Sequence, residues 1–200
     1  SQLKRILVPI GKEGKNTKVR QVHSSQIGFI CPHETPEGSQ SGIVKNMNPL
    51  VDVSIVDDNT FIRSVVEEIP SIQEKLFDWV HTLLAKNDFD WNFDKVILNG
   101  NWIGVTYDTE STLQSLRELK NNNILSVSVS FSHTKISREI NIFSDEGRML
   151  RPLFYRKNFP SLAEIKTKSF RQLVMEKKIV FLDSYEIENE VIAMTKEEMD

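Results

Sequence analysis

Cysteine is nearly absent from this 200-residue sequence, because Cys31 is the only one. A single cysteine excludes an internal disulfide and any zinc site that needs several thiolates. No apolar run approaches the roughly 20 residues that a membrane-spanning helix requires, and no secretory signal segment opens the sequence. We therefore expect an intracellular protein with no membrane contact. The missing initiator methionine fits a segment of a longer chain.

Acidic residues are scarce at the start of the sequence, although the net charge is −3. Residues 1–50 contain seven Lys/Arg and three Asp/Glu, whereas the remaining residues contain 18 and 25. This asymmetry predicts a basic loop or face that meets phosphates, carried on an acidic body. A solvated basic loop is the alternative interpretation. The hydrophobic content of 39% and charged content of 26% are those of an ordinary globular chain.

Short apolar stretches alternate with helical periodicity, which predicts an α+β fold of small modules. Short strands are expected near residues 3–10, 43–44, 51–56 and 179–182. Strands at 95–98 and 102–107 flank the hairpin turn Asn99-Gly100, and strands at 139–143 and 148–153 flank a second turn. Capping residues and periodicity predict helices over 71–84, from 108 or 109 to about 121, and over 161–174. Changes of pattern near residues 57 and 145 divide the chain into modules 1–57, 58–144 and 145–200.

Gly11-Lys12-Glu13-Gly14-Lys15 resembles a phosphate-binding loop only superficially. That motif needs four residues between its glycines and Ser or Thr after the lysine, whereas two intervene here and Asn16 follows. An exposed basic loop that approaches a nucleic-acid backbone fits the same residues.

Two further chemistries are disfavoured by spacing. His23, Cys31 and His33 with Glu34 or Glu37 do not have the ligand spacing of a structural zinc site. Cys31 beside His23 or His33 could act as a nucleophile, but a buried, inert cysteine is the more frequent case.

Glu34-Thr35-Pro36-Glu37-Gly38 predicts a stiff, bent segment that carries two carboxylates. Pro36 fixes its own φ and favours extended geometry at Thr35, while Gly38 lets the chain turn. Judged from these residues alone, internal pairing of Glu34 or Glu37 with Arg20 or Lys45 is favoured over a functional site.

Three consecutive motifs resemble the fork region of the second-largest subunit of multisubunit DNA-dependent RNA polymerases. They are Arg20-Gln21-Val22-His23, Gly28-Phe29-Ile30-Cys31-Pro32-His33-Glu34-Thr35-Pro36-Glu37-Gly38 and Gly42-Ile43-Val44-Lys45-Asn46. The family pattern has the same order and spacing, and the Lys-Asn ending is similar to that of archaeal, eukaryotic and viral members. Residues 9–15 resemble fork loop 2, residues 99–105 the hairpin of the external 1 domain, and residues 145–153 the opening of external 2.

The resemblance implies that residues 1–57 are the fork region, 58–144 external 1 and 145–200 external 2. It implies part of a nucleotidyltransferase that acts in transcription and is not catalytic by itself. The residues implied to lie near nucleic acid or the active centre are Lys12, Lys15, Lys18, Arg20, Gln21, His23, Glu34, Thr35, Pro36, Glu37 and Gly38. Arg148 and Arg151 are expected to pair or pack within external 2.

The resemblance also implies partners and compartment. The partners are the largest and other polymerase subunits, the DNA template, the RNA transcript and nucleoside triphosphates. No metal or other cofactor is expected in this segment, since the Mg²⁺ of the assembled enzyme belongs to the largest subunit. The compartment would be the nucleus for a cellular eukaryote, or the cytoplasm or virion for a large DNA virus.

Some positions depart from the family pattern. Ser41 replaces a small residue that is often Cys, Ile27 replaces an aromatic residue, and residues 70–94 form a longer and more apolar stretch. These differences indicate a divergent source such as a large DNA virus. The alternative function is a stand-alone module that contacts DNA or a polymerase subunit without catalysis. Hydrolysis through Cys31 and His33 is a third hypothesis with little beyond composition behind it.

Overall fold

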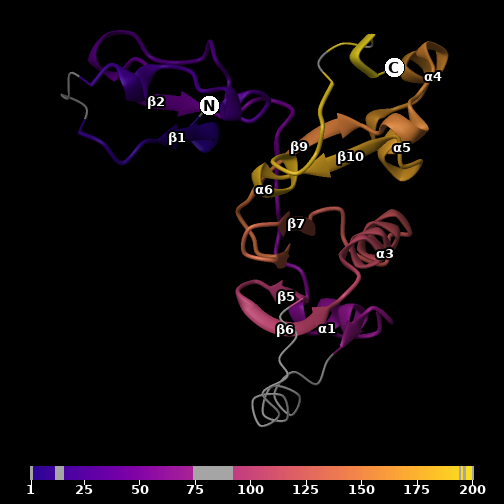
Figure 1. Cartoon of the computed structure of the whole chain (residues 1–200). Helices are drawn as coiled ribbons and strands as arrows, with labels where there is room; N and C mark the ends of the chain where they lie inside the picture. The colour runs from indigo at the N-terminus through magenta and orange to yellow at the C-terminus, as the bar shows by residue number, and fades with distance from the viewer. Residues whose placement is uncertain (1, 12–15, 74–91, 194, 196, 200) are drawn as a thin grey trace.

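The computed structural model describes residues 2–11, 16–73, 92–193, 195 and 197–199, and these form an α+β fold (Figure 1). The strands are β1 (Arg5–Leu7), β2 (Val44–Asn46), β3 (Asp52–Val53), β4 (Ile72–Gln73), β5 (Asp94–Leu98), β6 (Asn101–Thr106), β7 (Ser130–Thr134), β8 (Glu139–Phe143), β9 (Met149–Phe154) and β10 (Ile179–Leu182). The α-helices are α1 (Asn59–Glu67), α3 (Thr109–Asn121), α4 (Leu162–Thr167), α5 (Phe170–Met175) and α6 (Ser184–Ile187). Short 3-10 turns are η1 (Gln2–Lys4), η2 (Lys18–Arg20), η3 (Ser24–Gln26), η4 (Gly38–Gln40), η5 (Arg156–Asn158) and η6 (Glu197–Met199). Among these helices, none has the length and apolar character needed to cross a membrane.

The middle of the chain folds around a five-stranded sheet with the order β4-β6-β5-β8-β7. β5 and β6 form the predicted hairpin, and its turn residues Asn99 and Gly100 have φ values of 47° and 81°. β8 returns parallel to β5, and β7 pairs antiparallel with β8. The Asn-Gly prediction is confirmed because both turn residues adopt the positive φ that this hairpin requires.

The main hydrophobic core lies between this sheet and two helices. Ile62 and Val66 of α1 and Leu116 of α3 pack with the buried strand residues Val96 and Ile140. The helix predicted from position 108 or 109 is confirmed as α3, with Asp108 as its N-cap. The sequence interpretation did not include α1. Its signals were the capping aspartate at 58 and apolar residues four positions apart on one face.

A three-stranded sheet, with the order β10-β9-β3, carries the end of the chain. The predicted strands at 139–143 and 148–153 exist as β8 and β9, but the turn between them joins two different sheets. β3, from the first 57 residues, pairs with β9 at Asp52–Leu150 and Val53–Met149. The three-module division stays a prediction.

Two helix predictions are wrong in part. The expected helix over 161–174 is two helices, because Ser161 and Ser169 each form a capping box and Lys168 between them is extended. The second box starts a new helix without glycine or proline. The helix expected from residue 71 does not begin there, because Ile72 is buried and pairs with Thr106 as part of β4. The remainder of that predicted helix lies outside the described residues, as do positions 12–15 of the basic loop.

β1 and β2 form a separate two-stranded sheet, which Figure 1 shows to one side of the other two. Leu7 pairs with Val44 and Arg5 with Asn46. The predicted strands near 3–10, 43–44 and 51–56 are therefore present but short, as β1, β2 and β3. The residues predicted to be functional lie in the sequence between these two strands.

Candidate nucleic-acid interface

The segment Arg20–Gly38, called here the Arg20–Gly38 block, consists of short turns and irregular chain. Its apolar anchor is Phe29, which is 5% exposed and whose carbonyl accepts a hydrogen bond from Asn48 N at 2.9 Å. Two residues later, Cys31 N donates to Asn46 O, also at 2.9 Å. The block is thus fastened to β2 and to the chain just beyond it.

Side-chain hydrogen bonds stiffen the bend that follows. The Thr35 hydroxyl donates to Val44 O at 3.0 Å and accepts from Gly42 N at 2.8 Å. The buried Asn46 amide donates to Glu34 O at 2.9 Å. The bend is therefore held by one hydroxyl and one amide, both of which satisfy backbone groups next to β2.

Arg20 fastens the other end of the bend. Its Nη1 donates to Ser39 O at 2.8 Å and to Ser41 O at 2.6 Å. Gly42 has a φ of 74°, and a Cβ there would lie 2.7 Å from Arg20 O. Glycine is therefore required at 42 both by backbone conformation and by the close approach of the Arg20 backbone. Arg20 therefore supports the bend through its hydrogen bonds to Ser39 O and Ser41 O. The predicted contact of Arg20 with a phosphate stays a prediction.

The predicted acidic turn lies at the surface. Glu34 and Glu37 are exposed and Pro36 is half-buried. Gly38 adopts a φ of 77°, and the space around its missing Cβ is open. The bend therefore presents two carboxylates to the solvent on a fixed backbone.

His23 and Gln21 precede the anchored part of the block and are both exposed. His23 caps η3, because Ser25 N donates to Nδ1 at 3.2 Å and Ser25 Oγ lies 2.8 Å from the same atom. In this arrangement a neutral ring carries its proton on Nε2. The Lys45 ammonium donates to Gln26 Oε1 at 3.3 Å, which ties β2 to η3.

The basic residues divide into described and undescribed ones. Lys12 and Lys15 lie outside the described residues. Lys18 is exposed in η2, and its backbone N–H donates to Asn16 Oδ1 at 3.1 Å. An exposed lysine therefore lies two positions before Arg20, at the start of the turn that leads into the Arg20–Gly38 block.

Arg148, which was predicted from the sequence to pair or pack within residues 145–200, has a buried side chain with several hydrogen-bond partners. Its side chain is 9% exposed, and Nη1 donates to Asp183 Oδ2 and to Ser130 Oγ, both at 2.8 Å. Nη2 donates to Ser128 O at 2.8 Å, and Nε lies 3.1 Å from Asp145 Oδ1. Pairing within residues 145–200 is confirmed, but the two serines belong to the five-stranded part of the chain.

Arg151 was expected to pair or pack within residues 145–200, but it also contacts the first part of the chain. Its Nη1 donates to Ile27 O at 3.3 Å, across 124 positions of sequence. A residue of β9 thereby contacts the Arg20–Gly38 block. Such a long-range contact has no local sequence signal.

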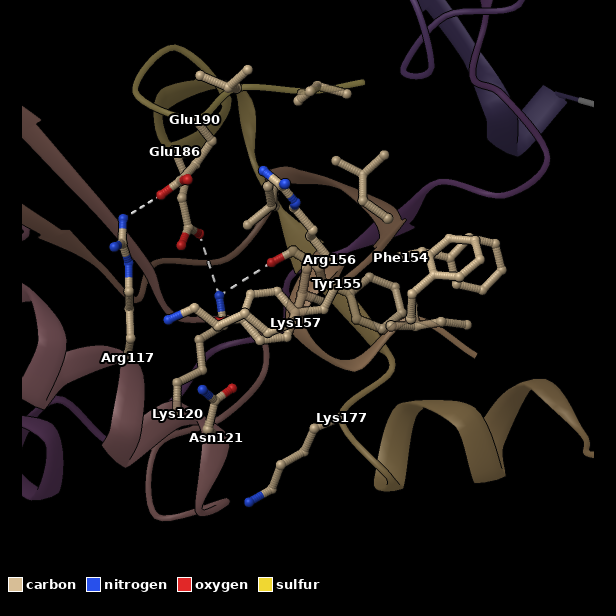
Figure 2. A pocket seen from close by; sticks show the side chains of 18 of the residues that line it. Arg117, Lys120, Asn121, Phe154, Tyr155, Arg156, Lys157, Lys177, Glu186 and Glu190 are labelled. Carbon is tan, nitrogen blue, oxygen red and sulfur yellow. Dashed lines mark hydrogen bonds and ion pairs between the residues drawn. The ribbon is translucent and has the colours of Figure 1, made fainter. Parts of the chain in front are cut away.

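A hollow of about 730 Å³ lies between α3 and the β9–β10 sheet (Figure 2). Its lining includes the basic residues Arg117, Lys120, Arg156, Lys157 and Lys177, the aromatic residues Phe154, Tyr155 and Phe159, and the acids Glu186 and Glu190. Arg117 pairs with Glu190 at one side, as the dashed line in Figure 2 marks. The lining comes from four separate segments of the chain, within residues 117–127, 153–159, 174–182 and 186–198, so sequence patterns did not predict it.

Glu186 is the titratable group most affected by this environment. It is 5% exposed, and burial raises its pKa to about 7, a shift that the neighbouring Lys120 opposes. The Lys120 ammonium lies 3.3 Å from Glu186 Oε2 and donates to Phe181 O at 3.1 Å. The charges of Asp183 and Glu190 raise the pKa further.

A second buried carboxylate, Asp94, lies at the start of β5. Burial raises its pKa, but hydrogen bonds from Thr109, Arg138 and His133 outweigh that effect and hold the pKa below its usual value. His133 Nε2 lies 3.0 Å and Arg138 Nε 3.1 Å from the carboxylate. This cluster joins β5, β7 and α3.

Within the described ranges, no group of three or more His, Cys, Asp or Glu side chains could hold a metal ion. Cys31 is a free, half-buried thiol. A stiff, exposed bend next to the exposed Lys18 fits the surface of an enzyme that acts on nucleic acid.

Comparison with known proteins identifies that enzyme class. Residues 1–53 match the family model for RNA polymerase Rpb2, domain 3, and residues 96–157 match the model for domain 4. The chain is 34% identical over its whole length to a probable DNA-directed RNA polymerase II subunit RPB2 homolog of Invertebrate iridescent virus 6, and covers 16% of that protein. It is 32% identical over its whole length to subunit RPB2 of Schizosaccharomyces pombe, covering 18%, and 30% identical to subunit Rpo2 of Sulfolobus acidocaldarius, covering 19%.

The chain belongs to the family of second-largest subunits of DNA-directed RNA polymerase. It spans less than one fifth of the length of these relatives. The predicted family is confirmed. The family models of domains 3 and 4 match the start and the middle of this chain.

Proposed function

We propose that this chain is a segment of a second-largest polymerase subunit that borders the active centre and the downstream DNA during transcription. In this proposal the Arg20–Gly38 block forms a stiff wall of the nucleic-acid cleft. Lys12, Lys15 and Lys18, which precede the block in sequence, hold phosphates. Such contacts contribute affinity without reading sequence.

The observation that carries the proposal is the rigid bend next to β2. The side chains of Arg20, Thr35 and Asn46 form hydrogen bonds with backbone groups of the bend and of β2. Glu34 and Glu37 are left at its exposed surface. A fixed backbone close in sequence to the exposed Lys18 supports the role of a wall that positions a nucleic-acid strand.

The wider assembly is part of the same proposal. The segment acts with the largest and other subunits, the template DNA, the transcript and nucleoside triphosphates, and the assembled enzyme is a nucleotidyltransferase. The Mg²⁺ of the assembled enzyme is assigned to the largest subunit, as the resemblance to the family implies. The compartment, nuclear in a eukaryotic cell or cytoplasmic or virion-associated for a virus, is proposed on the same basis.

A salt titration of DNA binding by the complete polymerase tests the proposal. Replacing Lys15 and Lys18 by Ala should reduce the slope of log affinity against log salt by about 0.9 for each lost phosphate contact. Arg20→Ala should in addition slow elongation, because it removes the support of the bend at Ser39 and Ser41. The exposed Lys166→Ala variant serves as the matched control. An unchanged slope in the double lysine variant would refute the phosphate-holding role.

A further inference from the structure

Arg151 of β9 lies directly over the backbone of Gly28 in the Arg20–Gly38 block. A Cβ added at Gly28 would be 2.2 Å from Arg151 Nε and 2.6 Å from Cζ, so the guanidinium occupies the place of the missing side chain. Gly28 also has a φ of 84°, which glycine adopts without strain. Arg151 Nη1 donates to Ile27 O at 3.3 Å, the carbonyl next to this glycine. The contact therefore depends on a glycine on one side and on a long cation on the other.

The strand that carries Arg151 is held firmly. Arg151 pairs with Leu182 of β10, and the preceding residue, Leu150, is 3% exposed and pairs with Asp52 of β3. Arg148, three positions before Arg151 in the sequence, pairs with Asp183 and hydrogen-bonds to the serines described above. β9 is thus the central strand of its sheet and a rigid base for the Arg151 side chain.

On the other side of the contact, Gly28 is itself part of the proposed cleft wall. Gly28 is followed by the buried Phe29, and Ile30 forms a bridge with Met47 beyond β2. Cys31 N donates a hydrogen bond to the carbonyl of Asn46, the last residue of β2. A displacement of Gly28 would therefore be transmitted to the bend that Thr35 fastens to β2.

We propose that Arg151 is a positioning residue that holds the Arg20–Gly38 block, the proposed cleft wall, in place against the three-stranded sheet. This role rests on the proposed function of the block. The coupling between Arg151 and Gly28 does not depend on that function, so the two are tested separately.

The test uses the complete polymerase with Arg151→Ala, Arg151→Lys, Gly28→Ala and the double variant Gly28→Ala/Arg151→Ala. Arg151→Ala should accelerate amide exchange in residues 20–47 on the order of tenfold, because long-range contacts of this kind couple by factors of that size. Arg151→Lys should restore part of the protection, since a lysine can still donate to Ile27 O. The exposed Arg171→Ala variant on α5 is the control and should leave exchange unchanged.

The double variant tests the steric fit. Gly28→Ala in the wild-type background should accelerate exchange as Arg151→Ala does, because its Cβ displaces the guanidinium. In the Arg151→Ala background the same change should add less, because the obstructing atoms are gone and only the strain of alanine at a positive φ remains. Independent, multiplying effects of the two changes would overturn the proposed fit.

Elongation kinetics test whether this positioning serves the reaction. Arg151→Ala should lower kcat several-fold while the KM for nucleoside triphosphates changes less than about twofold, because the block faces the strand and not the incoming nucleotide. Unchanged exchange in residues 20–47, or unchanged kcat, would overturn the positioning role. Failure of the proposed function itself would show in the salt slope of the Lys15 and Lys18 variant, which Arg151 does not affect.

Discussion

Removing the Arg148 side chain should strongly destabilise the fold. Arg148→Ala leaves the Asp183 carboxylate, whose side chain is 2% exposed, without its cationic partner at 2.8 Å. It also removes the donors to Ser130 Oγ and Ser128 O. Breaking a buried pair by removing one partner costs about 3–5 kcal/mol. Because domains are stable by only about 5–15 kcal/mol, this loss would be a large fraction of the total.

The measurement is denaturant unfolding of the chain, with the slope compared between variants to exclude a change in the unfolded state. Asp183→Asn/Arg148→Ala should be more stable than Arg148→Ala alone by about 1–3 kcal/mol, since no buried charge is left unpaired. The exposed Arg171→Ala variant should stay within about 0.5 kcal/mol of wild type. A cost below about 1 kcal/mol for Arg148→Ala, or strictly additive costs in the double variant, would refute the assignment of Arg148 as a buried hub.

Three further outcomes follow from single positions. Gly42→Ala should cost more stability than Gly38→Ala in denaturant unfolding, because both have positive φ but only position 42 adds a Cβ 2.7 Å from Arg20 O; equal costs would contradict this. Burial raises the pKa of Glu186 above its unfolded value, so its contribution to stability is present at pH 4.5 and is lost as pH rises toward about 7. Glu186→Gln should remove that part of the pH dependence, and an unchanged profile would contradict it. In footprinting of the complete polymerase, Thr35→Val should loosen the bend more than Thr60→Val at the exposed cap of α1, and equal effects would count against the hydroxyl's role.

Local chemistry explains which parts of the fold were predictable. The β5–β6 hairpin follows from Asn99-Gly100, and α4 follows from the Ser161 capping box, because both signals act within a few residues. The second capping box, at Ser169, has the same form, but the periodic apolar residues around it led to the prediction of one continuous helix. Helix ends were therefore decided by caps more than by periodicity.

Long-range partners explain which parts were not predictable. The placement of β8 and β9 in different sheets depends on β3 pairing with β9, almost 100 positions away. In the candidate site, the stiffness of the acidic turn was predicted from Pro36 and Gly38. The hydrogen bonds of Thr35 and the packing of Arg151 on Gly28 were not, because their partners are selected only when the chain folds.

Photo-crosslinking in the complete elongation complex tests the central claim most directly. A photoreactive amino acid would replace Lys18 in one variant and Glu37 in another, and the 98% exposed Ile136 in the control. We expect crosslinks from positions 18 and 37 to DNA at the downstream edge of the transcription bubble, well above the control. Crosslinking to DNA no greater than that from position 136 would contradict the placement of the Arg20–Gly38 block beside the nucleic acid.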